Sequence, residues 1–219
     1  MKIINPSIEI LTETTYSSML NRLERIGRVC YKSEDKIKVD SAEGFIRGII
    51  KRGHESVIEH ESISVKVVCD RGVSHEIVRH RIASYSQEST RYCNYSEGKF
   101  DGHITVIDPI TGFGWNLDDP QDEDKHRIWM SAMLDADRHY LDMIKAGATP
   151  QEARSVLPNS LKTELVMTMN LREWRHFIRL RDNLKAHPQA QEVAHKIGVE
   201  FAKRYPVFFE DLEGSDGNA

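Results

Sequence analysis

Residues 79–92, RHRIASYSQESTRY, gather side chains that can bind an anionic ligand. The members that carry this chemistry are Arg79, His80, Arg81, Glu88, Ser89 and Arg91. A guanidinium offers a planar fork of donors that matches phosphate oxygens, and serine hydroxyls add neutral donors. Glu88 would repel a phosphate, so it fits better as an acceptor for a ribose hydroxyl or as the partner of an arginine. The pattern favours a nucleotide site, and the alternative is a solvated surface loop.

A second basic segment is NLREWRHFIRLR, residues 170–181, which contains four arginines. Helical spacing places Arg181 on the same face as three apolar residues, Leu171, Trp174 and Ile178. A charge on a core-facing stripe is unusual. Arg181 therefore either points into a pocket or extends its charged end to the surface.

Periodicity predicts the elements that must position these side chains. We predict helices at residues 16–26, 40–50, 74–80, 122–146, 150–157, 171–181 and 188–201. We predict strands at residues 62–69, 104–107 and 163–169, a loop at 79–92 and an exposed connection at 108–120. Capping boxes are expected at Asp40 with Glu43 and at Thr149 with Glu152, and Asn170 is expected to cap the next helix. This mixture, without regular βαβ alternation or a glycine-rich dinucleotide motif, predicts an α+β fold with an antiparallel-type sheet and not a Rossmann fold.

Composition sets the broad class of the protein. The chain has 219 residues, 39% of them hydrophobic and 29% charged, which predicts one domain over residues 1–212 and a disordered tail at 213–219. No apolar run approaches the ~18 residues of a membrane span, so we expect no membrane association. The three cysteines lack a CxxC spacing and are expected to be reduced thiols in a cytoplasmic protein. The net charge of −4 argues against a nucleic-acid-binding protein.

Several of these segments together resemble one enzyme family. Arg79-His80-Arg81, followed after seven residues by Ser89, resembles the RHRx7S signature of the flavin-dependent thymidylate synthases. The other matching segments are Gly53-His54-Glu55-Ser56 with Glu59-His60, Arg154 with Leu157-Pro158, Asn170-x-Arg172, and Leu180-Arg181. The matches follow the order of the family's motifs and cover most of the chain.

The resemblance implies an activity, a cofactor and an assembly. Members of this family convert dUMP to thymidylate, with methylenetetrahydrofolate as the carbon donor and FAD, reduced by NADPH, as the source of the hydride. They have an α+β fold and are typically homotetramers whose active sites combine residues from several subunits.

The resemblance also implies roles for individual residues. The residues expected to bind FAD are His54, Ser56, Arg79, His80, Arg81, Glu88, Asn170, Arg172 and His176. The residues expected to bind dUMP are Glu76, Arg79, Ser89, Arg91, Arg154 and Arg181. Arg181 is also the expected catalytic residue, because a cation at the uracil edge stabilises the negative charge that develops on the ring. This chain departs from some members at Glu76-Ile77, where they have Gln-Trp, and at His176, where they have asparagine.

Three other interpretations remain at this stage. A metal hydrolase would use His54, His60, His75 and His80, but their spacing is not the HExxH pattern of a helical zinc site. A nucleic-acid-binding module would use the arginine-rich helix, against the acidic net charge. Ser89 or Cys93 would be the nucleophile of a covalent mechanism, although the sequence places no histidine set beside either.

Overall fold

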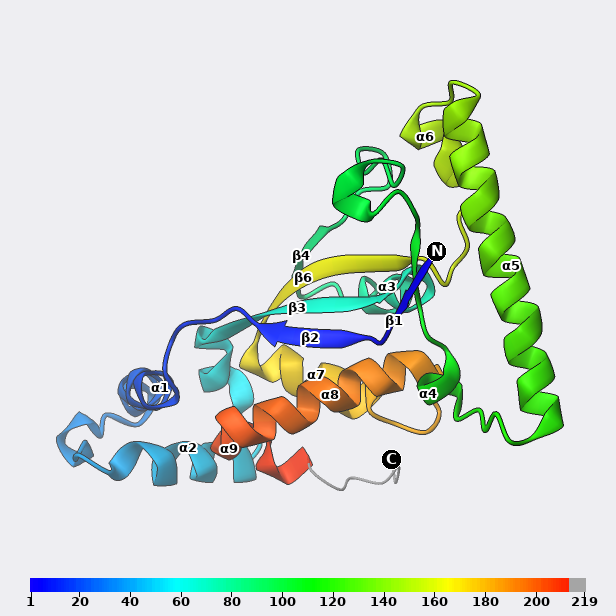
Figure 1. The fold of residues 1–219 in the computed structure, drawn as a ribbon. Coiled ribbons are helices and arrows are strands. Elements are labelled where there is room, and N and C mark those ends of the chain that lie inside the picture. The colour runs from blue at the N-terminus through cyan, green and yellow to red at the C-terminus, as the bar shows by residue number, and fades with distance from the viewer. Residues whose placement is uncertain (213–219) are drawn as a thin grey trace.

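A computed structural model describes residues 1–212, and the disorder predicted for residues 213–219 lies outside that range. The strands are β1 (Lys2–Ile4), β2 (Ser7–Ile10), β3 (Ser62–Asp70), β4 (Ser84–Gln87), β5 (Thr105–Ile107) and β6 (Lys162–Asn170). Four of them form an antiparallel sheet in the order β2-β3-β6-β4, and β1 pairs with β5 in parallel. The α+β prediction is therefore confirmed (Figure 1).

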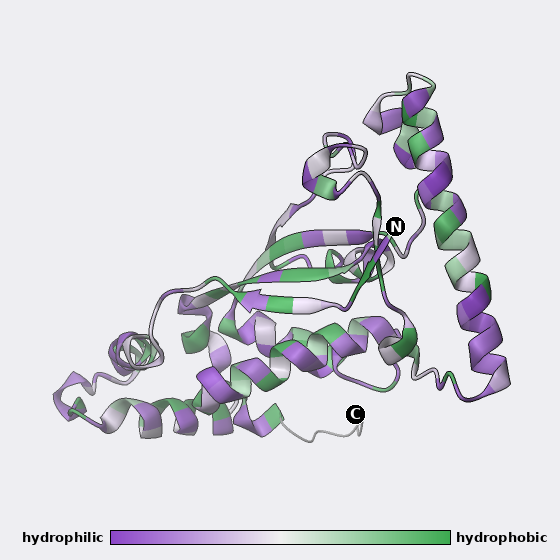
Figure 2. Ribbon diagram, in the orientation of Figure 1, coloured by the Kyte–Doolittle hydropathy of each residue, from purple (hydrophilic) through white to green (hydrophobic). Residues whose placement is uncertain are grey.

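The helices are α1 (Tyr16–Tyr31), α2 (Ser41–Lys51), α3 (Arg71–Ile77), α4 (Ile110–Phe113), α5 (Pro120–Lys145), α6 (Pro150–Ala153), α7 (Leu171–Arg181), α8 (Pro188–Arg204) and α9 (Pro206–Phe209). Short 3-10 turns add η1 (Glu34–Lys36), η2 (Glu55–His60), η3 (Gly98–Phe100), η4 (Arg154–Val156) and η5 (Glu210–Leu212). Helices α7 and α8 lie against one face of the antiparallel sheet, and α5 stands beside it (Figure 1). Both colours of the hydropathy scale alternate along α5 and α8 in Figure 2, as expected for helices that bury only one side.

The central ladder joins β3 to β6 over nine residue pairs, from Ser62 opposite Asn170 to Asp70 opposite Lys162. Alternate residues of both strands face the core, so that Val65 and Met167 are directly opposite and both fully buried. Side chains alternate between the two faces of a strand, which explains why the period-two pattern located both strands in the sequence.

Each strand of this ladder runs directly into a capped helix. The Asp70 carboxylate accepts a hydrogen bond from the backbone N–H of Val73 at 2.6 Å and starts α3. The Asn170 side chain accepts one from the N–H of Glu173 at 2.9 Å and starts α7, as predicted. Because the strands are antiparallel, the two helices start at opposite ends of the ladder. At ~1.5 Å per residue they extend roughly 10 and 16 Å toward each other. Their C-terminal ends therefore meet over the sheet.

A smaller core attaches α5 to the rest of the protein. Met133 and Tyr140 of α5 are buried in it against Ile104 and Val106. The buried Asp137 carboxylate accepts a hydrogen bond from the N–H of Ile104 at 2.8 Å. Within residues 1–212, none of the helices combines the length and apolar character that crossing a membrane would require.

The segment predicted as a loop is only partly irregular. Residues 84–87 form β4, which pairs with the middle of β6. The Tyr85 hydroxyl donates to the carbonyls of Ile77 and His80, at 2.9 and 2.8 Å. The period-two alternation was present in the sequence, but its outward residues are serines and its inward ones are Tyr85 and Gln87. Because these residues are mostly polar, their alternation did not resemble that of a half-buried strand, and the strand was not predicted.

Other local predictions also need correction. Helix α3 starts at Arg71 rather than Ser74 because Asp70 caps it. The expected capping box at Asp40 is absent: Glu43 pairs instead with Arg47, four residues later on α2. By contrast, Glu152 does accept a hydrogen bond from the N–H of Thr149, at 2.7 Å, as predicted.

The connection at residues 108–120 contains α4, which packs against α8. Gly112 permits this approach, because a Cβ there would lie 2.6 Å from the side chain of Gln189. Strands β1 and β2 were not predicted. Both are short, with three and four residues, and give little periodic signal.

Candidate active site

An open cavity of about 830 Å³ lies where the C-terminal ends of α3 and α7 meet. Its lining residues come from residues 76–82 and from α7 with the loop that follows it: Glu76, Arg79, His80, Arg81, Ile82, Glu173, His176, Arg179, Leu180, Arg181, Asn183, Lys185 and Ala186. The antiparallel ladder thus brings the first part of the polar stretch to the end of the arginine-rich helix. Six of the residues predicted for the site line this one cavity: Glu76, Arg79, His80, Arg81, His176 and Arg181.

Arg181 lies in this cavity and does not extend to the surface. Its side chain is 15% exposed and forms an ion pair with Glu76 at 2.8 Å. It donates two further hydrogen bonds, to the backbone carbonyl of Glu76 and to Nε2 of His80, both at 3.0 Å. Three of the five guanidinium N–H donors are used in this way, which leaves two for a ligand.

His80 is the buried partner that orients Arg181. Burial, together with the charge of Arg181 and the neighbouring His176, lowers the pKa of His80 to about 4. The imidazole is therefore neutral near pH 7. Because Nε2 accepts from Arg181, the ring proton lies on Nδ1, which faces the Glu173 carboxylate at 3.6 Å.

A second cavity, of about 580 Å³, adjoins the first and shares Ile82, Glu173, His176 and Arg179 with it. Its other lining residues are Glu55, Glu59, Asn170 and Arg172. It therefore contains two more residues of the predicted flavin set, Asn170 and Arg172. Arg172 pairs with Glu59 of η2, and the hydrogen bond and charge of that carboxylate raise the pKa of Arg172.

The second half of the polar stretch lies elsewhere. Strand β4 separates Arg81 from Glu88, and its four residues alone span ~13 Å. The Glu88 carboxylate forms an ion pair with Lys162 at 2.8 Å and accepts from the Tyr95 hydroxyl at 3.0 Å. Arg154 lies beside this segment, 3.5 Å from the hydroxyl of Thr90.

Four predicted ligand-binding residues therefore form a separate group: Glu88, Ser89, Arg91 and Arg154. None of them lines either of the two cavities described above. The residues predicted to bind ligands thus lie in two separate groups.

His54 and Ser56 flank Glu55 at the start of η2, and both are exposed. The hydroxyl of Tyr31, at the end of α1, lies 2.7 Å from Nδ1 of His54. This contact orients the imidazole of His54 beside the second cavity, whose wall includes the adjacent Glu55.

Sequence reasoning assigned no role in the site to Glu55, Glu173, Arg175 or Arg179. Glu55 was quoted only as part of a motif. Arg175 lies four residues after Leu171 and three before Ile178, so helical spacing alone indicated that it points inward. Its side chain is 1% exposed, which makes it the most deeply buried cation of the arginine-rich helix.

The structure does not favour a metal site or a covalent nucleophile. His54, His60, His75 and His80 do not come together; within residues 1–212 the metal-type cluster is His80, Glu173 and His176. His80 directs a protonated nitrogen toward Glu173, which opposes metal binding. Burial raises the pKa of Cys93, the opposite of what an activated thiol requires.

Comparison with known proteins identifies relatives of this chain. The family model described as thymidylate synthase complementing protein matches residues 11–207. A flavin-dependent thymidylate synthase of Pyrococcus abyssi is 34% identical over 174 residues, covering 79% of this chain and 68% of the relative. Its counterpart in Pyrococcus horikoshii is 31% identical over 205 residues, covering 93% and 79%.

A solved structure provides an independent comparison of the fold. The crystal structure of the UMP/dUMP methylase PolB from Streptomyces cacaoi, bound with 5-Br dUMP, superposes with a TM-score of 0.74 at 24% identity. The match covers 97% of this chain and 96% of that one. The family model and the identity to the two relatives give one assignment. The chain belongs to the flavin-dependent thymidylate synthase family.

Proposed function

We propose that the protein is a flavin-dependent thymidylate synthase. It converts dUMP to dTMP with methylenetetrahydrofolate as the carbon donor and releases tetrahydrofolate, and NADPH is the reductant. The observation that carries the proposal is the cavity that joins the RHR segment to Arg181, in a chain that belongs to this family.

The paired cavities suit FAD as the cofactor. Besides Arg181, their cationic lining residues are Arg79, Arg81, Arg172, Arg179 and Lys185, whose charges match a pyrophosphate. Ile82 and Leu180 are 67% and 50% exposed there and provide apolar surface for a ring system. When bound, FAD supplies the hydride chemistry, and the protein contributes binding, orientation and electrostatics.

Arg181 is proposed to act on the pyrimidine. Glu76 and His80 fix the guanidinium before the substrate arrives, so no reorganisation is needed during the reaction. The two remaining donors would then contact the uracil edge, where negative charge develops as C5 becomes nucleophilic. Neutral His80 supports this role because it accepts a hydrogen bond without adding a competing positive charge.

The separate group at Ser89, Arg91 and Arg154 leads to the proposed assembly. In a homotetramer, one subunit would bind the dUMP phosphate with this group and its neighbour would bind the base with Arg181. Residues 1–212 would act as a single domain in each subunit. Three sizeable ligands also need more concave surface than one small domain readily offers, and subunit clefts supply it. The proposed compartment is the cytoplasm, where free thiols such as Cys30, Cys69 and Cys93 stay reduced.

Two experiments test the proposed function: an absorbance spectrum of the purified protein and an assay of the reaction. We expect the purified protein to be yellow or to be thermally stabilised by added FAD. With dUMP, methylenetetrahydrofolate and NADPH we expect dTMP and tetrahydrofolate in equal amounts. A protein that neither binds FAD nor forms dTMP under these conditions would contradict the proposed function.

A further inference from the structure

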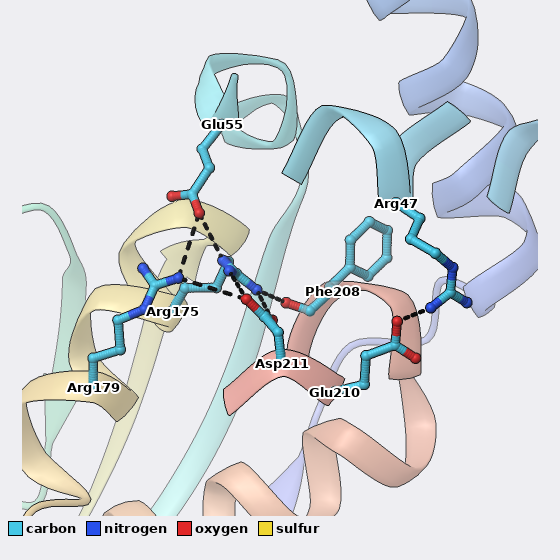
Figure 3. Close-up of polar contacts among 7 residues, drawn as sticks. All are labelled: Arg47, Glu55, Arg175, Arg179, Phe208, Glu210 and Asp211. Carbon is cyan, nitrogen blue, oxygen red and sulfur yellow. Dashed lines mark hydrogen bonds and ion pairs between the residues drawn. The ribbon is translucent and has the colours of Figure 1, made fainter. Parts of the chain in front are cut away.

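Arg175 is the centre of a buried ionic network that the proposed chemistry does not use (Figure 3). Its Nε donates to the Glu55 carboxylate at 3.1 Å. Its two terminal nitrogens donate to both oxygens of Asp211, at 2.7 and 2.6 Å, and one of them also donates to the carbonyl of Phe208. Burial acts to lower the pKa of Arg175, but the hydrogen bond and charge of Asp211, with Glu55, outweigh it and raise that pKa.

The network joins three segments that are far apart in the sequence. Glu55 belongs to η2, Arg175 to α7, and Asp211 to the turn η5 that follows α9. Figure 3 shows the Arg175 guanidinium between the two carboxylates, with Arg179 directed toward the same pair. Arg179 lies 3.5 Å from Glu55 and 3.8 Å from Asp211.

Stability alone does not explain a charge at this position. The neighbouring inward residues of α7 are apolar, namely Trp174, Phe177 and Ile178. A well-packed apolar side chain is often as stabilising as a buried ion pair, because removing charges from water is costly. What an arginine adds is geometry, since its planar fork fixes the direction of each carboxylate that it binds.

Glu55, one of the two carboxylates that Arg175 fixes, lies in the wall of the second cavity. Glu55 is 16% exposed and lines this cavity together with Asn170, Arg172 and His176. It is also the first residue of η2, with His54 and Ser56 on either side. The contact of Glu55 with Arg175 therefore helps to place residues 54–59 relative to α7, together with the buried Val57 and Ile58 and the Glu59–Arg172 ion pair.

We propose that Arg175 and Asp211 are positioning residues for flavin binding. The C-terminal turn orients Arg175, Arg175 holds Glu55, and Glu55 keeps residues 54–59 in place on the cavity wall. The identity of the ligand, FAD, rests on the proposed function. The contacts that run from Asp211 through Arg175 to Glu55 do not, because they are present without a ligand.

The same turn provides a matched control. Glu210, adjacent to Asp211, pairs with Arg47 of α2 and makes no contact with η2 or α7 among those shown in Figure 3. Asp211→Asn and Glu210→Gln each remove one carboxylate charge from the turn. Only the first interrupts the link to Glu55.

The first measurement is the FAD affinity of each variant. We expect Asp211→Asn to raise the Kd for FAD about tenfold and Glu210→Gln to change it less than twofold. In a Glu55→Gln background, Asp211→Asn is expected to add less than about twofold, because residues that act through one another are not additive. Equal effects of the two turn variants, or a full additional loss in the Glu55→Gln background, would overturn the proposal.

The second measurement needs no flavin. Amide hydrogen exchange in residues 54–60 is expected to accelerate at least about fivefold in Asp211→Asn and to stay unchanged in Glu210→Gln. If the parent protein fails to bind FAD, the proposed function fails, but this comparison still tests the link. If exchange in residues 54–60 is the same in both variants, the positioning role is wrong even when FAD binds.

Discussion

Arg181 is held by three hydrogen bonds before any substrate arrives, so its charge is already placed where the proposed reaction needs it. We expect Arg181→Ala to lower the rate by a factor of ~10²–10³, the usual cost of one lost stabilising donor. Arg181→Lys is expected to recover only part, because an ammonium cannot reproduce the planar fork. Single-turnover oxidation of the reduced enzyme, with flavin content measured in parallel, provides the check. Loss of flavin before loss of rate would contradict the assigned role.

Arg172 provides the comparison with Arg181. It is 54% exposed and pairs with Glu59 at the edge of the second cavity, away from the Arg181 ion pair. We expect Arg172→Ala to weaken FAD retention before it lowers the rate, because its proposed ligand is the cofactor. The same two measurements separate the variants. If Arg172→Ala keeps its flavin and loses rate, the division of roles between the two arginines is wrong.

His80 gives the folded protein a defined response to acid. Its pKa is about 4 in the folded state and near 6.5 in an unfolded chain. The unfolded chain therefore binds the proton first as pH falls, and stability is lost between pH 6.5 and about 4. At ~1.4 kcal/mol per pKa unit, the total is on the order of 3 kcal/mol. Denaturant unfolding of the parent and of His80→Gln across this range is the measurement. Identical pH dependence in both would show that His80 does not contribute.

At the scale of elements, the residue that caps α7 is also part of the cavity wall. Asn170 accepts from the N–H of Glu173 and also lines the second cavity. We expect Asn170→Ala to cost about 1 kcal/mol of unfolding free energy, the usual value for a lost cap. Asn170→Asp is expected to restore this stability, because a carboxylate caps equally well. Urea unfolding gives both values. If Asn170→Asp is as destabilised as Asn170→Ala, the cap does not explain the loss.

The antiparallel β3–β6 ladder is what unites the site elements. It starts α3 and α7 at opposite ends and lets them converge, so Glu76 and Arg181 meet although 105 positions separate them in the sequence. Strand β4 has the opposite effect: it carries Ser89 and Arg91 away from Arg79 and His80, which belong to the same continuous motif. The residues of this one motif therefore lie in two separate places.

At the scale of the whole molecule, the two separate groups of residues predict complementation between impaired variants. Arg181→Ala and Arg154→Ala alter different groups and are each expected to lose most of the activity. Co-expressed, they are expected to regain activity, because some shared sites would take Arg181 from one chain and Arg154 from another. Arg181→Ala with Glu76→Ala is the control, since both changes affect the same group and no intact site can form. Activity in the control, or none in the test pair, would contradict a shared site.

The sequence by itself determined the class, the family resemblance and much of the secondary structure. Period-two burial located β3 and β6, and helical periodicity located α1, α5, α7 and α8, because each pattern depends only on nearby residues. It also placed Arg181 on the apolar face of its helix, and left open whether the guanidinium enters a pocket. The family resemblance rested chiefly on four residues at fixed spacing, Arg79, His80, Arg81 and Ser89, which chance rarely produces.

Only the tertiary structure decided which residues meet. Residues 84–87 form a strand because they pair with β6, and no local pattern of apolar residues predicts it. The partners of Arg181 lie 101 or more positions away in the sequence, and those of Arg175 lie 33 or more positions away. Antiparallel pairing and helix packing bring them into contact. Local sequence fixes which face of an element a side chain occupies. What it touches there depends on contacts between distant segments, and these exist only once the chain has folded.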